Sequence, residues 1–228
     1  MQEILGLVRR CVEDYDMIQS GDTVAVGVSG GKDSLLTLTA LARLSRFYPK
    51  PFRVVAMTVE AGTPGMSFDG VADYCRALGV EYIRVNVPIY EVVFLERREK
   101  NPCSLCAKLR RGALSTAMNE HGIRKIALGH HYDDVIETIL MSMIYGAQMQ
   151  SMMPKLHSDN VPGMQLIRPL YKVREEEIIR WRDDNHLEFL RCAWAPAAKA
   201  RTVTMAISLR SLLFIYYLCI LSYAAQKS

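Results

Sequence analysis

Residues 23–34 read TVAVGVSGGKDS and join a short apolar run to a glycine-rich loop and the start of a helix. A continuously apolar run such as 23–28 is typical of a strand buried on both faces of a parallel sheet. Glycines let the loop curve tightly, and the helix that opens at Asp33 directs its N–H groups and positive dipole end outward, beside the charge of Lys32. The stretch predicts an anion-binding loop at the carboxyl end of a strand, with Asp33 and Ser34 at an exposed turn.

Strands and helices alternate along the rest of the chain. Helical spacing of apolar residues predicts helices over 1–19, 35–47, 71–78, 104–120, 133–145 and 174–185. Further strands are predicted over 53–59, 82–87, 125–129 and 165–168, and residues 146–165 are expected to form a long loop. This alternation predicts an α/β fold, a doubly wound parallel sheet with helices on both faces. We expect an N-terminal helix within 1–20, one domain over 21–193 and an apolar C-terminal tail over 194–228.

Composition excludes several classes of protein. Half of the 228 residues are apolar and 23% are charged, which excludes disordered, collagen-like and multi-span membrane proteins. The formal charge of +4 comes from residues 191–228, which hold five basic and no acidic residues, whereas residues 1–190 are nearly neutral. Net charge therefore does not attract RNA to the body of the domain, and local clusters would have to do so. No signal peptide is visible, so a cytoplasmic protein is expected.

Two of the six cysteines, Cys103 and Cys106, lie on one face of the first turn of a predicted helix. A helix N-terminus favours the thiolate, which can bind metal or take part in redox chemistry. A redox disulfide lacks a thioredoxin-like context, and a structural zinc site needs four ligands. With the distant Cys192, the count favours an iron–sulfur cluster held by three thiolates with one open iron. Cys11, Cys75 and Cys219 are interpreted as packing residues.

Basic residues surround the two cysteines. Arg110 follows Cys106 by one helical turn and lies on the same face, either as part of a solvated charge run or as a clamp for a phosphate of ATP or RNA. Two clusters, Arg97-Arg98-Lys100 and Lys108-Arg110-Arg111, are the candidate docking sites for RNA.

Residues 129–138 read GHHYDDVIET and follow the fourth predicted strand, at the edge of the sheet where ligands bind. Asp133 or Asp134 could act as N-cap of the next helix. The alternative is a chemical role for Asp134, with His130 and His131 in the wall of a nucleotide pocket.

The glycine loop matches neither the Walker pattern, because Asp33 follows Lys32, nor the dinucleotide spacing. The order strand, S-G-G-x-D-S, helix resembles the PP-loop of the ATP pyrophosphatases. Over residues 5–193 the chain resembles the tRNA 2-thiocytidine synthetase (TtcA-like) branch of that superfamily. The segments that carry this resemblance are 14–18 (DYDMI), 29–34, 103–112 (CSLCAKLRRG), 129–138 and 167–170 (IRPL).

The resemblance implies a PP-loop fold and an enzyme that thiolates tRNA. Such an enzyme uses ATP and Mg²⁺ to adenylate a nucleobase oxygen, expected to be oxygen 2 of a cytidine, and replaces it with sulfur delivered through a 4Fe–4S cluster, releasing pyrophosphate and AMP. The residues implied for nucleotide binding are Ser29, Gly30, Gly31, Lys32, Asp33, Ser34, Gly129 and His130. Asp33 would also place Mg²⁺, and Asp134 and Arg110 would flank the activated oxygen. Cys103, Cys106 and Cys192 would ligate the cluster.

The resemblance also implies partners, namely tRNA, a sulfur donor such as a cysteine desulfurase, and a second subunit in a homodimer. Two alternatives stay open: a PP-loop enzyme that adenylates another base or a small acid, and an inactive relative that binds only ATP or the cluster. The second arises because the resemblance ends at Ala193. No membrane span is expected, because the 16 uncharged positions between Arg210 and Lys227 fall short of the roughly 20 apolar residues a spanning helix needs.

Overall fold

The computed structural model describes residues 1–96, 102–158, 161 and 163–187, apart from the side chains at positions 96 and 103. The expected domain boundary at 193–194 and the tail 194–228 lie outside these residues. Six strands form one sheet: β1 (Thr23–Gly27), β2 (Arg53–Glu60), β3 (Glu81–Asn86), β4 (Lys125–Ala127), β5 (Lys155–His157) and β6 (Gln165–Ile167).

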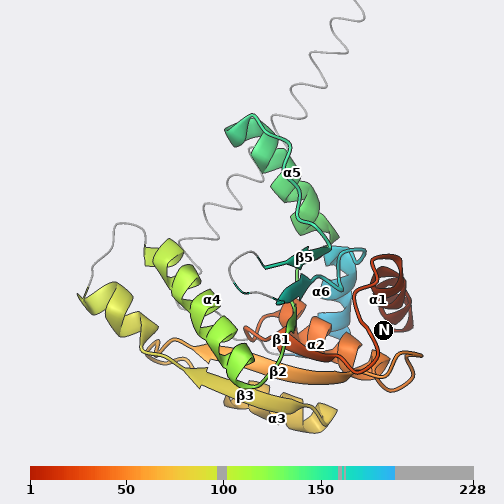
Figure 1. Cartoon of the computed structure of the whole chain (residues 1–228), viewed down its shortest axis with the longest axis horizontal. Helices are drawn as coiled ribbons and strands as arrows, with labels where there is room; N and C mark the ends of the chain where they lie inside the picture. Colours follow the sequence, from red (N-terminus) through yellow and green to blue (C-terminus); the bar gives the residue numbers. More distant parts are fainter. Residues whose placement is uncertain (97–101, 159–160, 162, 188–228) are drawn as a thin grey trace, which may run out of the picture. The chain divides into compact units, whose positions relative to one another are not determined.

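The strand order is β3-β2-β1-β4-β6-β5, and every pair is parallel except β5 with β6 (Figure 1). At the centre, Val24 of β1 lies opposite Val54 of β2 on one side and Lys125 of β4 on the other. The chain winds outward from β1 in both directions, so β1 ends at a topological switch point, where open α/β sheets bind ligands. The predicted parallel α/β sheet is confirmed.

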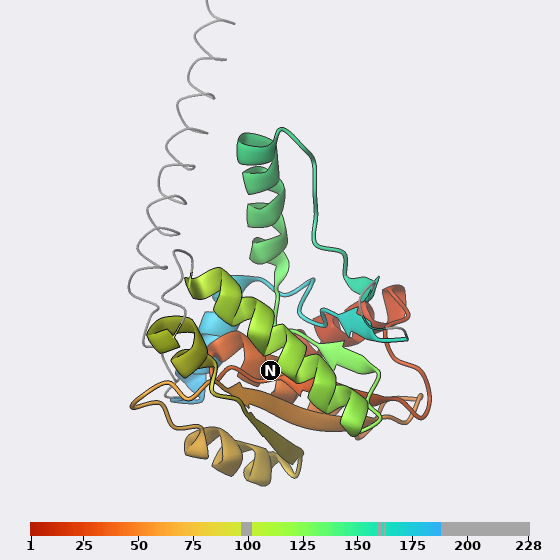
Figure 2. The same ribbon diagram turned by 60° about the vertical axis from the view of Figure 1, so that its left-hand side comes forward.

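Helices cover both faces of the sheet. They are α1 (Gln2–Asp14), α2 (Lys32–Leu44), α3 (Asp69–Leu78), α4 (Pro102–Glu120), α5 (Tyr132–Gly146) and α6 (Glu175–Asp184), with a π-helical segment, η1, over Glu91–Glu96. Because side chains alternate along a strand, Val24 and Val26 face a core formed with α1, α2, α3 and α6. Ala25 faces the opposite way, into a smaller core that includes Ala117 and Met118 of α4. Figure 2 shows α4 lying across the sheet. Residues 24–26 are fully buried, as the apolar run predicts.

Three segments differ from the sequence-based expectation. The first helix ends at Asp14 rather than near residue 19, because Asp16 turns the chain with a φ of 43° and its carboxylate accepts hydrogen bonds from Gln19 and Lys50. The expected loop 146–165 contains β5, which pairs with the edge of β6. The segment η1 was also not predicted.

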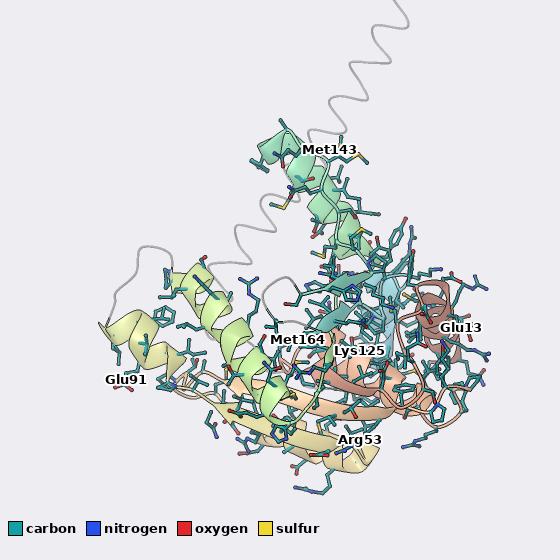
Figure 3. The ribbon with its side chains drawn as sticks, in the orientation of Figure 1. Glu13, Arg53, Glu91, Lys125, Met143 and Met164 are labelled. Atoms are coloured by element: carbon teal, nitrogen blue, oxygen red, sulfur yellow. The ribbon has the colours of Figure 1, made fainter. Side chains whose placement is uncertain are left out.

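Lys125 ties the amino-terminal edge of the sheet together. Its side chain is buried, its Nζ donates to the carbonyl oxygen of Met17 at 2.7 Å, and it forms an ion pair with Asp22 (Figure 3). This edge, opposite to the switch point, is therefore held by structural contacts.

Helix α5 carries many exposed apolar side chains, including Met143 (Figure 3) and Tyr145, and Val135 is its one buried residue among those described. Within the described ranges, no helix is long and apolar enough to cross a bilayer.

Candidate nucleotide-binding site

The glycine loop is closed on itself by the hydroxyl group of Ser34. The Ser29 backbone N–H donates to Ser34 Oγ at 3.2 Å, and Ser34 Oγ donates to the carbonyl oxygen of Gly31 at 2.9 Å. Gly30 has a φ of 79°, in the region that favours glycine, and Gly31 is the N-cap of α2. The expectation of an exposed Ser34 was wrong: its side chain is buried because it holds the loop together.

The base of the loop is anchored to the neighbouring strand. The Val28 N–H donates to the carbonyl oxygen of Met57, and the Thr58 hydroxyl donates to the carbonyl oxygen of Val28. The loop thus leaves a rigid strand end and enters α2 directly, so the first N–H groups of α2 and the positive end of its dipole lie beside the loop. This is the arrangement that binds a phosphate group.

Lys32 is half-buried beside two carboxylates. Its Nζ lies 2.6 Å from Asp33 Oδ1 and 3.1 Å from Glu175 Oε1. Burial lowers the pKa of Lys32, but the hydrogen bonds and charges of Asp33 and Glu175 outweigh this effect and hold the pKa above its usual value. Lys32 therefore carries a positive charge at the edge of the loop.

Gly129 brings the end of β4 against the first turn of α2. A Cβ atom at this position would lie 2.8 Å from the Asp33 carbonyl carbon and 3.0 Å from the Ser34 nitrogen, both in backbone that cannot easily shift. Only glycine lets the two segments approach this closely. The structure thus brings Gly129 and the loop residues together, as expected.

The polar string after Gly129 caps two helices. His131 is the N-cap of α5, and its backbone N–H donates to Asp134 Oδ2 at 2.9 Å. Asp133 Oδ2 instead accepts the N–H of Glu175, the first residue of α6, at 2.7 Å. A capping function was expected, but the position was not: neither aspartate is itself the N-cap of α5. With the close approach of Gly129 to Asp33 and the ion pair of Lys32 with Glu175, these contacts bring the starts of α2, α5 and α6 to one edge of the sheet.

His130 and Arg168 follow the neighbouring strands β4 and β6 at this edge. His130 Nδ1 and Arg168 Nε are buried and have no hydrogen-bond partner among the described residues. Burial lowers the pKa of His130, and the charge of Arg168 lowers it further, so the imidazole is neutral at pH 7. A buried polar atom without a hydrogen-bond partner reduces the free energy of unfolding. Such atoms at the edge where ligands bind therefore indicate a ligand-binding position.

Arg168 was not singled out from the sequence. A charged residue directly after a strand of a parallel sheet is a usable signal for a ligand-binding position, and Arg168 follows β6 in this way. Its guanidinium donates through Nη1 to the carbonyl oxygen of Met153, and its own carbonyl accepts from the Cys11 thiol.

Two of the three candidate cluster ligands, Cys103 and Cys106, lie one turn apart at the start of α4. Cys106 has a free, half-buried thiol and packs against the buried cluster of Ala61, Ile89 and Val93, near the carboxyl ends of β2 and β3. The Cys103 side chain and Cys192 lie outside the described residues. No group of three or more His, Cys, Asp or Glu side chains in the described part of the chain is arranged to hold a metal ion. Two cysteines in one helical turn, one thiol being free, are the soft donors that suit an iron–sulfur cluster.

Cys11 and Cys75 are buried packing residues, as expected. Burial raises the pKa of the Cys11 thiol to about 12 and that of the Cys75 thiol to about 11. Neither thiol is a metal-ligand candidate. Cys219 lies outside the described residues.

The basic residues of α4 divide into two environments. Lys108 and Arg111 are exposed, whereas Arg110 is half-buried and its Nε has no partner among the described residues. The separation agrees with different functions for Arg110 and its neighbours. The cluster 97–100 lies outside the described residues.

Comparison with known proteins gives consistent matches. Residues 6–193 match the PP-loop domain family. The tRNA-cytidine(32) 2-sulfurtransferase of Deinococcus radiodurans is 42% identical over 190 residues, which cover 83% of this chain and 63% of that protein. The Vibrio vulnificus protein of the same name is 42% identical over 175 residues, covering 76% of this chain and 56% of the relative. The chain thus spans about 60% of the length of these curated relatives.

A solved structure resembles the fold as well. The U34-tRNA thiolase NcsA from Methanococcus maripaludis, determined with its 4Fe–4S cluster, superposes with a TM-score of 0.68 at 27% identity. The match covers 85% of this chain and 66% of the thiolase chain.

Proposed function

This chain belongs to the PP-loop family, and we propose that it is an ATP-dependent tRNA sulfurtransferase that replaces oxygen 2 of a cytidine with sulfur. The observation that carries the proposal is the glycine loop 28–34, which is closed by the Ser34 hydroxyl, leads directly into α2 and packs against Gly129. The names of the curated relatives and of the solved thiolase support the choice of substrate and reaction.

In this proposal the loop and Lys32 bind the phosphates of ATP. The backbone N–H groups at the start of α2 would contact phosphate oxygens, and Lys32 would neutralise part of their charge. Asp33 would place the Mg²⁺ that accompanies ATP. Tight packing at Gly129 would keep this end of the loop fixed against the β4 side of the sheet.

The nucleobase would bind on the β4 and β6 side of the loop. Cytidine oxygen 2 attacks the α-phosphorus, pyrophosphate leaves, and the oxygen becomes part of a good leaving group. The neutral imidazole of His130 supports its place in the pocket wall, and Arg168 Nε–H is available to donate to an oxygen there. We assign Asp134 and Arg110 to positions that flank the activated oxygen. Arg110 Nε supports this assignment because it is buried and has no hydrogen-bond partner within the part of the chain that the structure describes.

Cys103, Cys106 and Cys192 would hold the 4Fe–4S cluster. When bound, such a cluster supplies an open iron site that can carry the incoming sulfur atom. The position of the free Cys106 thiol, near the carboxyl ends of β2 and β3, supports a cluster on the same edge of the sheet as the loop. AMP would leave as carbon 2 of the base takes up the sulfur.

The partners in this proposal are tRNA, a sulfur donor such as a cysteine desulfurase, and a second subunit in a homodimer. Exposed Lys108 and Arg111 on α4 would contact tRNA phosphates, together with the cluster 97–100. The reaction belongs to the cytoplasm, where tRNA is modified.

Mass spectrometry of tRNA nucleosides tests the proposal. Cells that carry the gene should contain 2-thiocytidine, and cells without it should lose that nucleoside alone. Restoration by the wild-type gene, but not by an Asp134→Asn variant, would assign the activity to this site. An unchanged thionucleoside profile, together with release of AMP from ATP in the absence of RNA, would instead indicate adenylation of a small acid.

A further inference from the structure

Lys32 stands between two negative charges that come from different parts of the chain. Asp33 is its sequence neighbour, whereas Glu175 is the first residue of α6, which begins more than 140 positions later. The Lys32 side chain is only 21% exposed and that of Glu175 is 46% exposed. The contact with Glu175 is therefore partly shielded from water, and it places a carboxylate against the cation that would meet a phosphate.

Glu175 is held in this position by its own backbone. Its N–H donates to Asp133 Oδ2 at 2.7 Å, which fixes the start of α6 against the start of α5. The Tyr132 N–H donates to the carbonyl oxygen of Val173 at 2.9 Å and strengthens the same junction. A carboxylate at a helix N-terminus is also favoured by the helix dipole. The carboxylate of Glu175 is thus presented to Lys32 by a rigid junction.

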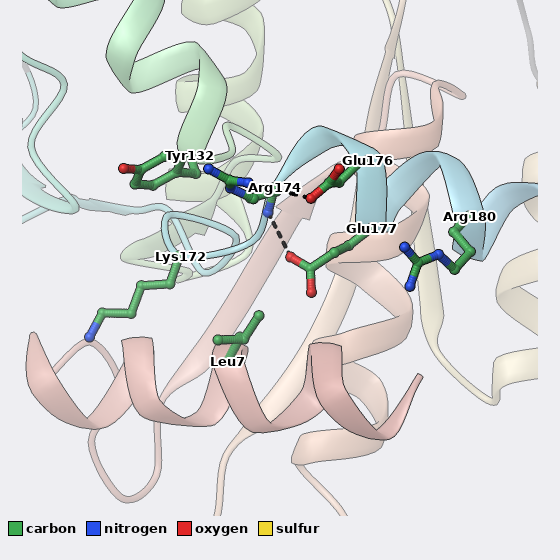
Figure 4. Close-up of a pocket in the computed structure, with 7 residues that line it drawn as sticks. All are labelled: Leu7, Tyr132, Lys172, Arg174, Glu176, Glu177 and Arg180. Carbon is green, nitrogen blue, oxygen red and sulfur yellow. Dashed lines mark hydrogen bonds and ion pairs between the residues drawn. The ribbon is translucent and has the colours of Figure 1, made fainter.

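The two following glutamates have a different partner. Glu176 lies 3.5 Å from Arg174, and Glu177 accepts the Arg174 backbone N–H at 2.9 Å (Figure 4). These residues line a cleft of about 400 Å³ beside α1. Of the three glutamates in the first turn of α6, Glu175 is therefore the one that forms an ion pair with Lys32 among the described residues.

A carboxylate and a phosphate oxygen compete for the same ammonium hydrogens. With Asp33 and Glu175 both beside it, Lys32 lies in a group with a net charge of −1, which disfavours the approach of a triphosphate. Asp33 is expected to turn to Mg²⁺ when Mg-ATP binds, which leaves Glu175 as the competitor. We propose that Glu175 is a positioning residue that holds Lys32 in the nucleotide-free protein and must be displaced by the phosphates of ATP. This inference rests on the proposed binding of ATP at the loop.

Isothermal titration with Mg²⁺ and α,β-methylene-ATP, which cannot be cleaved at the proposed bond, tests the inference. Glu175→Gln should bind the analogue about three- to fivefold more tightly than wild type, the range expected for removal of a partly exposed charge competitor. Glu176→Gln is the matched control, because it removes the same charge one residue away and should stay within about 1.5-fold of wild type. Glu175→Ala should reproduce the tighter binding.

A Lys32→Met background separates competition at Lys32 from a general charge effect. In that background, Glu175→Gln should no longer improve affinity, because the contested cation is gone. Equal affinities of Glu175→Gln and Glu176→Gln, or weaker binding by Glu175→Gln, would overturn the inference and leave the proposed function standing. Failure of the folded wild-type protein to bind the analogue at millimolar concentration would refute the proposed function itself.

Discussion

The Cα atom of Gly129 lies so close to the backbone of Asp33 that any side chain at position 129 would clash with that backbone. We predict that Gly129→Ala forces the end of β4 away from α2 and distorts the glycine loop. Overpacking of this kind costs about 1–3 kcal/mol of folding free energy, and nucleotide binding should fall with it. Urea unfolding and nucleotide titration measure the two effects.

Gly6→Ala is the control for this prediction. Gly6 lies within α1, and a Cβ atom there would meet no atom of the described residues within 4 Å. Alanine favours a helix over glycine by about 0.5–1 kcal/mol, so this variant should be as stable as wild type or more so. A Gly129→Ala protein that also retained stability and nucleotide affinity would contradict the predicted close contact.

Substitutions of Ser34 and Asp33 should have different effects on stability and on activity. Ser34→Ala removes the hydroxyl that closes the loop, so both nucleotide affinity and stability should drop, the latter by about 1–3 kcal/mol. Asp33→Asn should keep the fold and lose about 10²–10³ in the rate of AMP formation, because one charge contact is removed. Thermal unfolding and AMP release distinguish the two variants. Identical behaviour of both would show that the Ser34 hydroxyl does not shape the loop.

The cysteine turn of α4 should determine whether iron binds. Protein purified without oxygen should contain four iron and four sulfide per chain if the proposed 4Fe–4S cluster is present, and Cys106→Ser should lose most of both. Cys75→Ala is the thiol control, since Cys75 is buried in the main core and has a raised pKa. Iron and acid-labile sulfide assays give the answer. Stoichiometric zinc without sulfide in the wild-type protein would exclude the cluster.

His130 should make stability depend on pH. Burial, and then the charge of Arg168, hold the pKa of His130 below its usual value, so the unfolded chain binds this proton more readily than the folded one. The contribution of neutral His130 to the free energy of unfolding is therefore complete above about pH 6.5, the ordinary pKa of histidine. It is lost as the pH falls below that value. Urea unfolding between pH 5.5 and 7.5 should show a shallower dependence for His130→Asn than for wild type. Parallel curves would refute the assignment.

Binding of tRNA should depend on the exposed cations of α4. Reversing Lys108 and Arg111 to glutamate should weaken tRNA binding and reduce the salt slope by about 0.7–0.9 for each phosphate that the protein no longer neutralises. Reversal of Arg43 and Arg76, which are exposed on α2 and α3 across the sheet, is the matched control. Equal weakening in both double variants would indicate that general charge, and not the α4 surface, attracts RNA.

Features that depend on local pattern were predicted well. The buried run 24–26, the glycine loop and the helix after it follow from the order of apolar, glycine and polar residues, and the comparison with PP-loop proteins agrees with them. Strand β5 was missed because three residues within a loop rich in Gly and Pro become a strand only when β6 offers an edge.

Features that depend on distant contacts were not predictable in the same way. The burial of Ser34 arises from a loop that folds back on its own helix, and the pairing of Lys32 with Glu175 requires the sheet to bring β1 and the start of α6 together. That Arg168 Nε has no hydrogen-bond partner among the residues described can be recognised only after its surroundings are known. Sequence therefore identified the loop and the polar string, and the structure added the contacts among them.

The closed loop has a consequence for the kinetics of nucleotide capture. Ser34 already holds residues 29–31 in their curved conformation, so nucleotide binding does not have to order this backbone. Little conformational entropy of the chain is therefore lost on binding. The association rate is then governed by diffusion and by the electrostatic field at the loop, not by a folding step.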